Sequence, residues 1–486
     1  MTFNLDHSPL LKGLFSNVKK HPAKTAVITT DDRRISYREL WDYIIRAAVF
    51  LQKRNIRQND KIMLSAQKEV EFIYLYLAAH LLGITNVVVD AKNNKEHLEY
   101  IASEVNPMMC VGMQLSDCSS VEFSELSLPE LEDLTLPEDL SPNSTADIMF
   151  TSGTTGKPKG VLLSHYNVFS SASNINGFIG NSADDIELLG LPICHSFGLG
   201  RLRCNLIAGS TIVLHNGFAN LKSVFESFAK YGVTGFGMVP AIWAYIKKFS
   251  GKRISQYAAG LRYIEIGSAA LPVEDKQLLS ELFPKTRICM HYGLTEASRA
   301  LFMEFHEEQN DLNTIGRPVS TKVDVKIMDE DGKEIEDGLE GEICIKGNMV
   351  TSGYLQASDN SSAFYGDYFR TGDLGRKSEE GKYYLLSRLK EIINVGGKKV
   401  SPVEIENAVL DICGADSICV AVTDPDGILG EVPKLYVLSS TLSIPMEALK
   451  ESLKKKLEAY KYPRFFELTD KIPTTANGKK KRVEIK

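Results

Sequence analysis

Residues 61–89 read KIMLSAQKEVEFIYLYLAAHLLGITNVVV and predict a strand, a helix and a second strand. Lys61–Ser65 has the length and apolar content of a buried strand. Val70–Leu82 has the length of a helix, and Gly83 marks its end. Val87–Val89 is β-branched throughout. Because strands joined by a helix usually pair in parallel, this stretch predicts a layered α/β architecture.

The same alternation extends in both directions. Upstream, we expect short strands at 26–29 and 35–37 and a helix over 37–54 with one apolar stripe. Downstream, strand–helix alternation runs over 187–290. Residues 126–143 are acidic and contain prolines, which is typical of a surface connection.

The last third of the chain has a different pattern. Residues 323–329 and 341–346 are strand-rich and neighbour Asp-Gly turns, which indicates a small β region. Beyond it we expect a helix at 402–410, strands at 418–422 and 434–438, and an amphipathic helix at 446–458. We therefore predict two domains, a large α/β domain at 1–387 that includes the β subdomain, and a small α+β domain at 388–486.

Composition excludes several protein classes. The chain has 486 residues, a net charge of −6, 43% hydrophobic and 24% charged residues, which excludes a disordered or fibrous protein and argues against a nucleic-acid binder. Its eight cysteines form no CxxC pair, so we expect free thiols. Residues 1–6 do not resemble a signal peptide, and the apolar stretch 72–89 is a poor membrane span. We therefore expect a cytoplasmic protein.

The most informative motif is Thr151-Ser152-Gly153-Thr154-Thr155-Gly156-Lys157-Pro158-Lys159-Gly160, which lies between two apolar strands. Glycines let the backbone approach an anion, and hydroxyls and lysines add donors and positive charge. The spacing is not that of a Walker A loop. Pro158 and the β-forming run after it argue against a helix directly following. The motif predicts a phosphate-binding loop; the alternative is a flexible polar hairpin.

At these residues the chain resembles the adenylate-forming superfamily, which includes acyl-CoA synthetases, peptide-synthetase adenylation domains and beetle luciferases. Four further segments match the family's motifs in order: 291–296 (HYGLTE), 368–375 (YFRTGDLG), 387–406 (with SRLKEII, GG and PVEIE) and 473–479 (PTTANGK). The resemblance covers most of the chain.

The resemblance implies that ATP activates a carboxylic acid as an acyl-adenylate, with loss of pyrophosphate, before transfer to a thiol. It assigns the β- and γ-phosphates to a loop formed by Thr151, Ser152, Gly153, Thr154, Thr155 and Lys159. Glu296 would bind Mg²⁺, for which a carboxylate is a suitable hard ligand. Thr295 would contact the α-phosphate.

For the nucleoside, the resemblance assigns the adenine to Tyr292, Gly293 and the small residues Gly267, Ser268 and Ala269. It assigns the ribose to Asp373, a carboxylate that can accept from two hydroxyls, and to Arg388. Without the motifs, Tyr292 could equally be a core residue and Asp373 a turn residue. The family usually has Gly or Asp where this chain has Ser387, from which we expect little consequence.

The C-terminal domain is expected to be a mobile lid. Lys390 matches the hinge about which it rotates between the two half-reactions. Lys479 matches the lysine that bridges the substrate carboxylate and the phosphate, although Lys479–Arg482 alone could be a solvated basic tail. Gly396 and Gly397 match the loop that lines the thiol tunnel.

The segment Leu191–Gly200 matches the family's acyl-pocket motif. It lacks the Asp by which amino-acid activators bind an ammonium group, which favours an acid without an α-amino group. His195, Phe197 and Gly198 are expected to line the pocket together with Met238, although His195 could also be a core histidine. Arg201 and Arg203 depart from the expected apolar helix. One of them could meet a second anion, either a substrate carboxylate or a carrier-protein phosphate; the alternative is a helix-surface or ion-paired arginine.

The sequence therefore predicts an AMP-forming acyl-CoA synthetase that uses ATP, Mg²⁺ and coenzyme A, with fatty acid metabolism as the expected pathway. Two alternatives remain at this point. The acceptor could be the phosphopantetheine of a separate acyl carrier protein, or the chain could be a non-catalytic nucleotide-binding relative.

Overall fold

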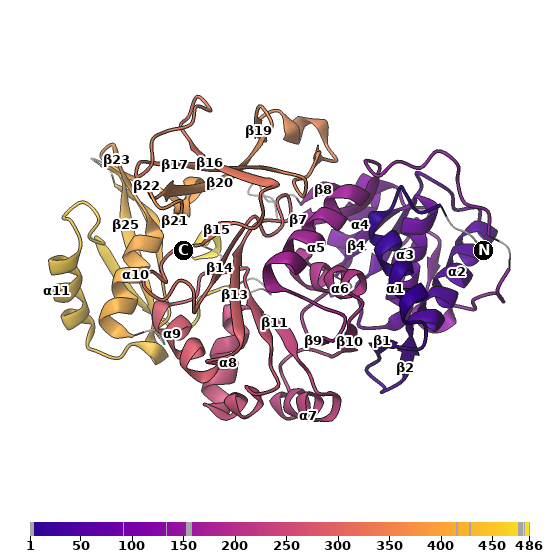
Figure 1. Ribbon diagram of the computed structural model, residues 1–486. Helices are drawn as coiled ribbons and strands as arrows, with labels where there is room; N and C mark the ends of the chain where they lie inside the picture. The colour runs from indigo at the N-terminus through magenta and orange to yellow at the C-terminus, as the bar shows by residue number, and fades with distance from the viewer. Residues whose placement is uncertain are drawn as a thin grey trace.

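The computed structural model describes residues 4–90, 92–132, 134–151, 158–414, 417–426, 429–474, 480 and 482–485. These residues form four β-sheets with helices packed on them (Figure 1). Three sheets belong to the N-terminal part of the chain, and the fourth to the C-terminal part at the left of Figure 1. The predicted layered α/β fold with a small C-terminal unit is confirmed.

The first sheet has nine strands in the order β15-β14-β13-β12-β11-β9-β10-β1-β2. Neighbouring strands from β1 to β13 along this order are parallel, and the strands at both edges are antiparallel. The strands are β1 (Thr25–Ile28), β2 (Arg34–Ser36), β9 (Ile186–Leu189), β10 (Thr211–Leu214), β11 (Gly235–Met238), β12 (Tyr263–Ile266), β13 (Arg287–Tyr292), β14 (Leu301–Glu304) and β15 (Arg317–Pro318).

The second sheet has seven strands in the order β18-β8-β7-β4-β3-β5-β6. They are β3 (Lys61–Ser65), β4 (Thr85–Val89), β5 (Met109–Val111), β6 (Ser120–Val121), β7 (Thr145–Thr151), β8 (Lys159–Ser164) and β18 (Gly353–Tyr354). β7 and β8 are antiparallel and pair Thr151 with Lys159. As predicted, a strand rather than a helix follows the phosphate motif, whose residues 152–157 lie outside the described residues.

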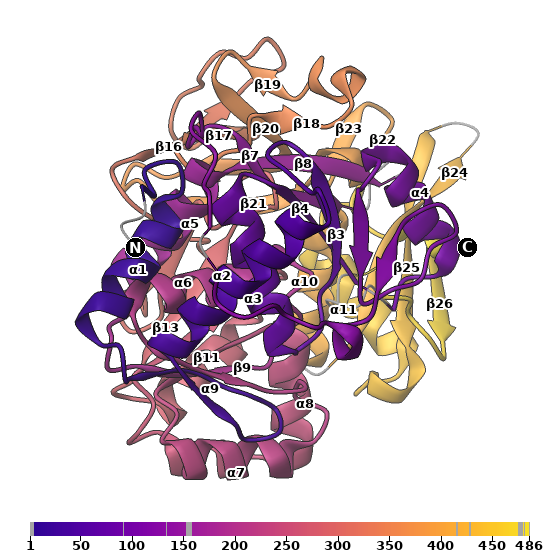
Figure 2. The ribbon, with the colours of Figure 1, turned by 90° about the vertical axis from the view of Figure 1, so that its right-hand side faces the viewer.

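Five helices lie between these two sheets (Figure 2): α1 (Pro9–Lys20), α2 (Tyr37–Lys53), α3 (Val70–Leu82), α5 (His165–Ile179) and α6 (Ser196–Ala208). In α3 every residue except Glu71 is buried, which explains why its sequence is apolar on all sides. The outer faces are covered by α4 (Lys95–Val105), α7 (Leu221–Tyr231), α8 (Pro240–Ser250) and α9 (Val273–Leu282).

The predicted β subdomain is a five-stranded sheet made of β16 (Val323–Met328), β17 (Glu340–Gly347), β19 (Phe364–Tyr365), β20 (Tyr368–Lys377) and β21 (Tyr383–Arg388). The C-terminal sheet consists of β22 (Ile393–Val395), β23 (Lys398–Val400), β24 (Cys419–Asp426), β25 (Gly430–Leu438) and β26 (Phe465–Thr469). α10 (Pro402–Cys413) and α11 (Met446–Lys456) complete a separate hydrophobic core there.

The basic C-terminal residues that the structure describes are not simply solvated. Lys480 and Arg482 both form ion pairs with Glu406 of α10, and Arg482 also pairs with Glu391 at 2.8 Å. The guanidinium of Arg482 is well shielded, with 13% of its side chain exposed. These pairs fasten the end of the chain to the small domain.

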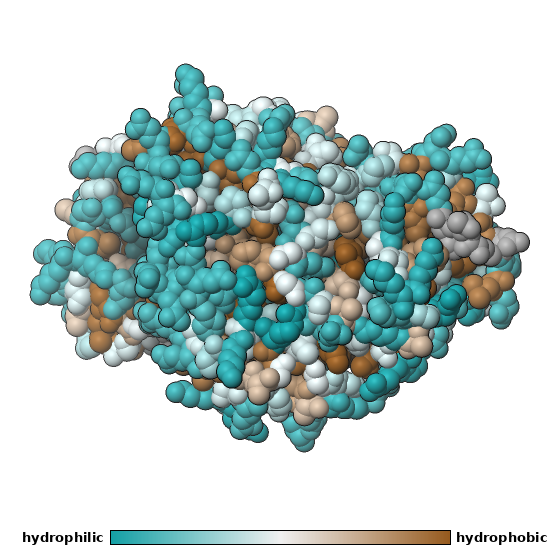
Figure 3. All heavy atoms as spheres, viewed as in Figure 1, coloured by the Kyte–Doolittle hydropathy of each residue, from teal (hydrophilic) through white to brown (hydrophobic). Residues whose placement is uncertain are grey.

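The state of the cysteines and the polarity of the surface match what the composition predicts. All eight cysteines are free. The face shown in Figure 3 is mainly hydrophilic, with hydrophobic residues in small separate groups. Among the described residues, no helix is both long enough and apolar enough to cross a bilayer.

Three buried histidines form a cluster between the helices. The ring of His165 contacts those of His7 and His80 at centroid distances of 5.6 and 4.9 Å. His80 pairs with Asp147 at 3.2 Å. Within the described part of the chain, neither ring nitrogen of His165 has a hydrogen-bond partner. Burial holds the pKa of His165 well below its ordinary value and also lowers the pKa of His7.

This cluster predicts acid sensitivity. Because their pKa values are lowered, His165 and His7 resist protonation in the folded chain, whereas in the unfolded chain they take up protons as the pH falls through about 6.5. The free energy of unfolding should therefore decrease below that pH, by up to about 1.4 kcal/mol per pH unit for each histidine. Urea unfolding midpoints measured from about pH 8 to pH 5 test this. His165→Leu should flatten the dependence and exposed His21→Leu should not; equal slopes for all three proteins would contradict the expectation.

Candidate functional site

A cavity of about 120 Å³ lies at the carboxyl ends of four neighbouring parallel strands of the first sheet. Its walls come from the segments after these strands: Leu191–Gly198 after β9, Val239 after β11, Ser268 after β12 and Gly293–Arg299 after β13. Met149 and Phe150 of β7 close it from the second sheet. Ligands of open α/β sheets bind at this edge, so the fold itself marks the cavity as a candidate active site.

The structure brings several predicted acyl-pocket residues to this cavity. His195 precedes α6 as its N-cap, and His195, Phe197 and Gly198 all line the cavity. A side chain at Gly198 would lie 2.1 Å from the carbonyl oxygen of Pro192, so only glycine fits there.

The prediction that Met238 lines the pocket is not met by this cavity. It is fully buried in the core beneath α7 and α8, and its neighbour Val239 borders the cavity instead. The reason is the strand geometry of β11, in which successive side chains point to opposite faces.

The predicted nucleotide residues meet next to the cavity. The hydroxyl of Tyr292, at the end of β13, donates to Asp373 Oδ2 at 2.6 Å. Arg388 Nε lies 2.9 Å from Asp373 Oδ1, and Arg388 Nη1 donates to the carbonyl of Thr371. Burial and the neighbouring carboxylate raise the pKa of Tyr292 well above its ordinary value. Three residues from three separate motifs thus form one contact.

The other nucleotide candidates have partners of their own or border the cavity. Ser268 adopts a positive φ of 75° and, like Gly293 and Thr295, borders the cavity, while Ala269 is half-buried beside it in sequence. Glu296 is buried and accepts a hydrogen bond from the Tyr354 hydroxyl at 2.8 Å. Lys159 forms an ion pair with Asp359 at 2.8 Å.

The remaining predictions lie elsewhere or outside the described residues. Lys390 is exposed in a short 3₁₀ turn, Leu389–Glu391, between β21 and β22. Gly396 and Gly397 form the exposed turn of the β22–β23 hairpin, where both have positive φ. Ser152, Gly153, Thr154, Thr155 and Lys479 lie outside the described residues. No group of metal ligands with three or more members occurs in the part of the chain that is described.

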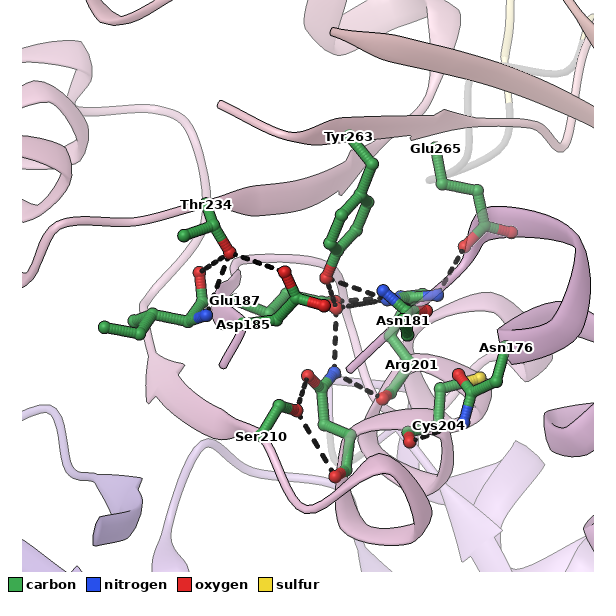
Figure 4. A network of polar contacts seen from close by, with 12 residues as sticks. Asn176, Asn181, Asp185, Glu187, Arg201, Cys204, Ser210, Thr234, Tyr263 and Glu265 are labelled. Carbon is green, nitrogen blue, oxygen red and sulfur yellow. Dashed lines mark hydrogen bonds and ion pairs between the residues drawn. The ribbon is translucent and has the colours of Figure 1, made fainter. Parts of the chain in front are cut away.

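A buried ion network connects strands of the first sheet with α6 (Figure 4). Glu187 of β9 and Glu265 of β12 both pair with Arg201 of α6, and all three side chains are fully buried. The hydroxyl of Tyr263 and the amides of Asn205 and Asn181 complete the hydrogen bonding of this network. Arg201 is therefore an ion-paired core residue, and its buried guanidinium is not exposed to a substrate carboxylate or a carrier-protein phosphate. Arg203 likewise pairs with buried Asp147 and Tyr76.

Sequence reasoning missed the part of this network that reaches the cavity. Glu265 Oε1 lies 2.7 Å from Arg299 Nε and 2.8 Å from His291 Nδ1, and both Arg299 and His291 line the cavity. Burial would raise the pKa of Glu265, but Arg299, His291 and Arg201 hold it well below its ordinary value. The sequence does contain a signal for this network, because each of the apolar strands Ile186–Leu189 and Tyr263–Ile266 includes one glutamate.

Two glycines make room for these side chains. A Cβ at Gly267 would lie 2.1 Å from the ring of His291, and a Cβ at Gly200 would lie 2.4 Å from Arg299 Nη1. Both distances are far shorter than ordinary contacts, so neither position can carry a side chain while these two residues keep their places.

Two family models match the chain. The AMP-binding enzyme family matches residues 14–355, and the AMP-binding enzyme C-terminal domain matches residues 404–479. Oxalate–CoA ligase of Arabidopsis thaliana is 30% identical over 98% of both chains. 2-Succinylbenzoate–CoA ligase of Bacillus licheniformis is 28% identical and covers 99% of this chain and 100% of its own.

Solved structures agree over the same length. o-Succinylbenzoate coenzyme A synthetase from Bacillus subtilis, solved with ATP and magnesium ion, has a TM-score of 0.86 at 26% identity and covers 97% of this chain and 98% of its own. ATP-bound MatB from Rhodopseudomonas palustris has a TM-score of 0.87 at 23% identity, covers 99% and 98% of the two chains, and shows the shared fold.

The ion network predicts a large stability effect. Arg201→Met leaves two buried carboxylates short of a partner and should lower the free energy of unfolding by about 3–5 kcal/mol. Lys222→Met, which removes an exposed partner of Glu226, should change it by less than about 0.5 kcal/mol. Urea unfolding of both variants measures the difference. Equal midpoints would show that the network does not stabilise the fold.

Proposed function

The chain belongs to the family of AMP-binding enzymes and is an acid–CoA ligase, and on this premise we propose how its own residues divide the reaction. A carboxylic acid without an α-amino group binds in the cavity, and ATP binds beside it. The carboxylate attacks the α-phosphate, pyrophosphate leaves, and coenzyme A then displaces AMP from the acyl-adenylate. Energetically, the first step needs neutralisation of phosphate charge and exact placement of the attacking oxygen.

One observation carries this proposal: the contact of Tyr292, Asp373 and Arg388 beside the cavity. We assign the ring of Tyr292 to the adenine and the Asp373 carboxylate to the ribose hydroxyls, with Arg388 holding the other oxygen of Asp373. The strand ends Thr151 and Lys159 carry the phosphate loop between them, and Lys159 adds positive charge. Ser268 and Gly293 bring backbone close to the nucleotide.

Magnesium fits one residue of the described chain in particular. Glu296 is a hard oxygen donor next to Thr295, and Mg²⁺ takes only one or two protein carboxylates when it also binds phosphate oxygens. When bound, the ion would supply charge neutralisation on the phosphates. The Tyr354 hydroxyl holds the Glu296 carboxylate in position.

We further assign the small domain to residues 388–486, with its hinge at Lys390 and with Lys479 bridging carboxylate and phosphate in the adenylating position. Gly396 and Gly397 would line the thiol path in the second position. Arg388 ends β21 in the sheet of the large domain, and Ile393 begins the separate C-terminal sheet, so the exposed turn between them is the natural pivot.

Pyrophosphate release with ATP, Mg²⁺ and a panel of acids, with and without coenzyme A, tests the proposal. Release with one class of acid that is accelerated by coenzyme A is the expected result. Release that stalls near one equivalent despite coenzyme A would instead indicate a carrier protein as the acceptor. No release with any acid would contradict the proposal.

The two half-reactions should separate in a Lys479→Ala variant. Its adenylation rate should fall on the order of 10²–10³-fold, because a cation that stabilises transition-state charge is lost. Its rate of thioester formation from supplied acyl-adenylate should change little. The exposed lysine variant Lys471→Ala is the matched control and should retain both rates. Equal losses in both half-reactions would remove the assigned role of Lys479.

The nucleotide contact makes a separate prediction. Asp373→Asn should raise the KM for ATP on the order of tenfold, since a charged hydrogen-bond acceptor is worth about 1.5–3 kcal/mol. Tyr292→Phe keeps the ring and loses only the hydroxyl, so it should raise this KM less. Steady-state kinetics with saturating acid measure both values, and an unchanged KM in Asp373→Asn would contradict the ribose assignment.

A further inference from the structure

The cavity is too small for a long acyl chain. An apolar protein cavity of about 150 Å³ holds one benzene molecule, and this one is about 120 Å³. Part of its wall is a packed apolar cluster of Leu191, Phe197 and Val239. Even a Cβ at Gly237 of β11 would lie 2.9 Å from Leu191 and 3.2 Å from Phe197. There is room for an acid on the order of six non-hydrogen atoms.

The wall of the cavity carries a hydrogen-bond donor. Arg299 is 2% exposed, and its guanidinium has five N–H groups. Four of them bind Glu265, the carbonyls of Ser196 and Phe197, and the hydroxyl of Ser298. The fifth, on Nη2, has no partner among the residues that the structure describes.

The same wall carries an imidazole. His291 Nδ1 lies 2.8 Å from the Glu265 carboxylate, and its ring meets the Phe197 ring edge-on at 4.7 Å. Burial lowers the pKa of His291, which favours the neutral ring. A neutral imidazole has one donor and one acceptor nitrogen, and a hydroxyl can pair with either.

The buried side-chain charges next to Arg299 and His291 already balance. Two carboxylates, Glu187 and Glu265, face two guanidiniums, Arg201 and Arg299. Lys68, another buried cation of this region, donates to the carbonyls of Leu189 and Leu191, and burial lowers its pKa to about 7. A second carboxylate on the substrate would therefore be a buried charge without a counter-ion, which is costly.

We propose that the substrate is a short carboxylic acid with an uncharged hydrogen-bonding group, such as a hydroxyl, at its far end, selected by Arg299 and His291. Glu265 is the positioning residue that orients both side chains. This inference rests on the proposed acid–CoA ligase activity, and it excludes both long-chain fatty acids and small dicarboxylates as preferred substrates.

Three acids with the same number of non-hydrogen atoms test the inference: 4-hydroxybutanoate, pentanoate and malonate. The kcat/KM for pyrophosphate release should be at least about tenfold higher for 4-hydroxybutanoate than for either of the others. Hexadecanoate should not react. A preference for pentanoate, malonate or hexadecanoate, or equal values, would overturn the inference while leaving the ligase activity intact. No release with any acid would instead overturn the proposed function itself, and this inference with it.

A charge-balanced double variant tests the residues. Glu265→Gln with Arg299→Met removes one carboxylate and one guanidinium, and the ratio of kcat/KM for 4-hydroxybutanoate over pentanoate should fall to near one. Both substrates are measured on the same sample, so a loss of folded enzyme cancels from the ratio. Asp147→Asn with Arg203→Met removes a buried pair that does not border the cavity, and should leave the ratio unchanged. An unchanged ratio in the first variant, or an equal fall in the second, would contradict the assignment.

Discussion

The ion network of Glu187, Glu265, Arg201 and Arg299 is the constraint on which the active-site cavity depends. Buried charges are tolerated only when paired and hydrogen-bonded, so the four groups must stay in register with one another. Glu187 and Glu265 are fixed by the sheet, and Arg201 fixes α6 against it. Because His195 and Phe197 lie at the start of α6, the network sets their distance from the strand ends that border the cavity.

The network also explains several small residues around it. Gly200 and Gly267 lie where any side chain would collide with Arg299 or His291. Arg299 itself has a positive φ of 55°, a strained conformation for a long side chain. The strain is compensated by four hydrogen bonds, two of which hold the first turn of α6. The local sequence is thus shaped by the charges, and not only by the substrate.

Much of the fold could be predicted because its signals are local. The apolar lengths of β3, α3 and β4, the Asp-Gly turns of the β subdomain and the strand after the phosphate motif are all properties of short segments. The contact of Tyr292, Asp373 and Arg388 could be predicted only through the resemblance, since these residues are far apart in sequence. The roles of Glu265 and Arg299 could not be predicted from the sequence, because they depend on a side-chain contact between residues 34 positions apart. Met238 was wrongly assigned to the pocket because successive side chains along a strand point to opposite faces. A shift of one residue along the strand therefore exchanges the cavity face for the core face.

This arrangement separates two tasks within one site. In the proposed assignment, the nucleotide binds to loops whose residue types are dictated by ATP, so a shared motif set is expected wherever this chemistry occurs. In the same proposal, the acid binds between α6 and the strand ends, where the supporting charges are buried and their balance decides which group of the acid can be desolvated. Two ligases can therefore share the fold over almost their whole length and still accept different acids. A single buried charge beside the cavity changes which charge the substrate can carry there.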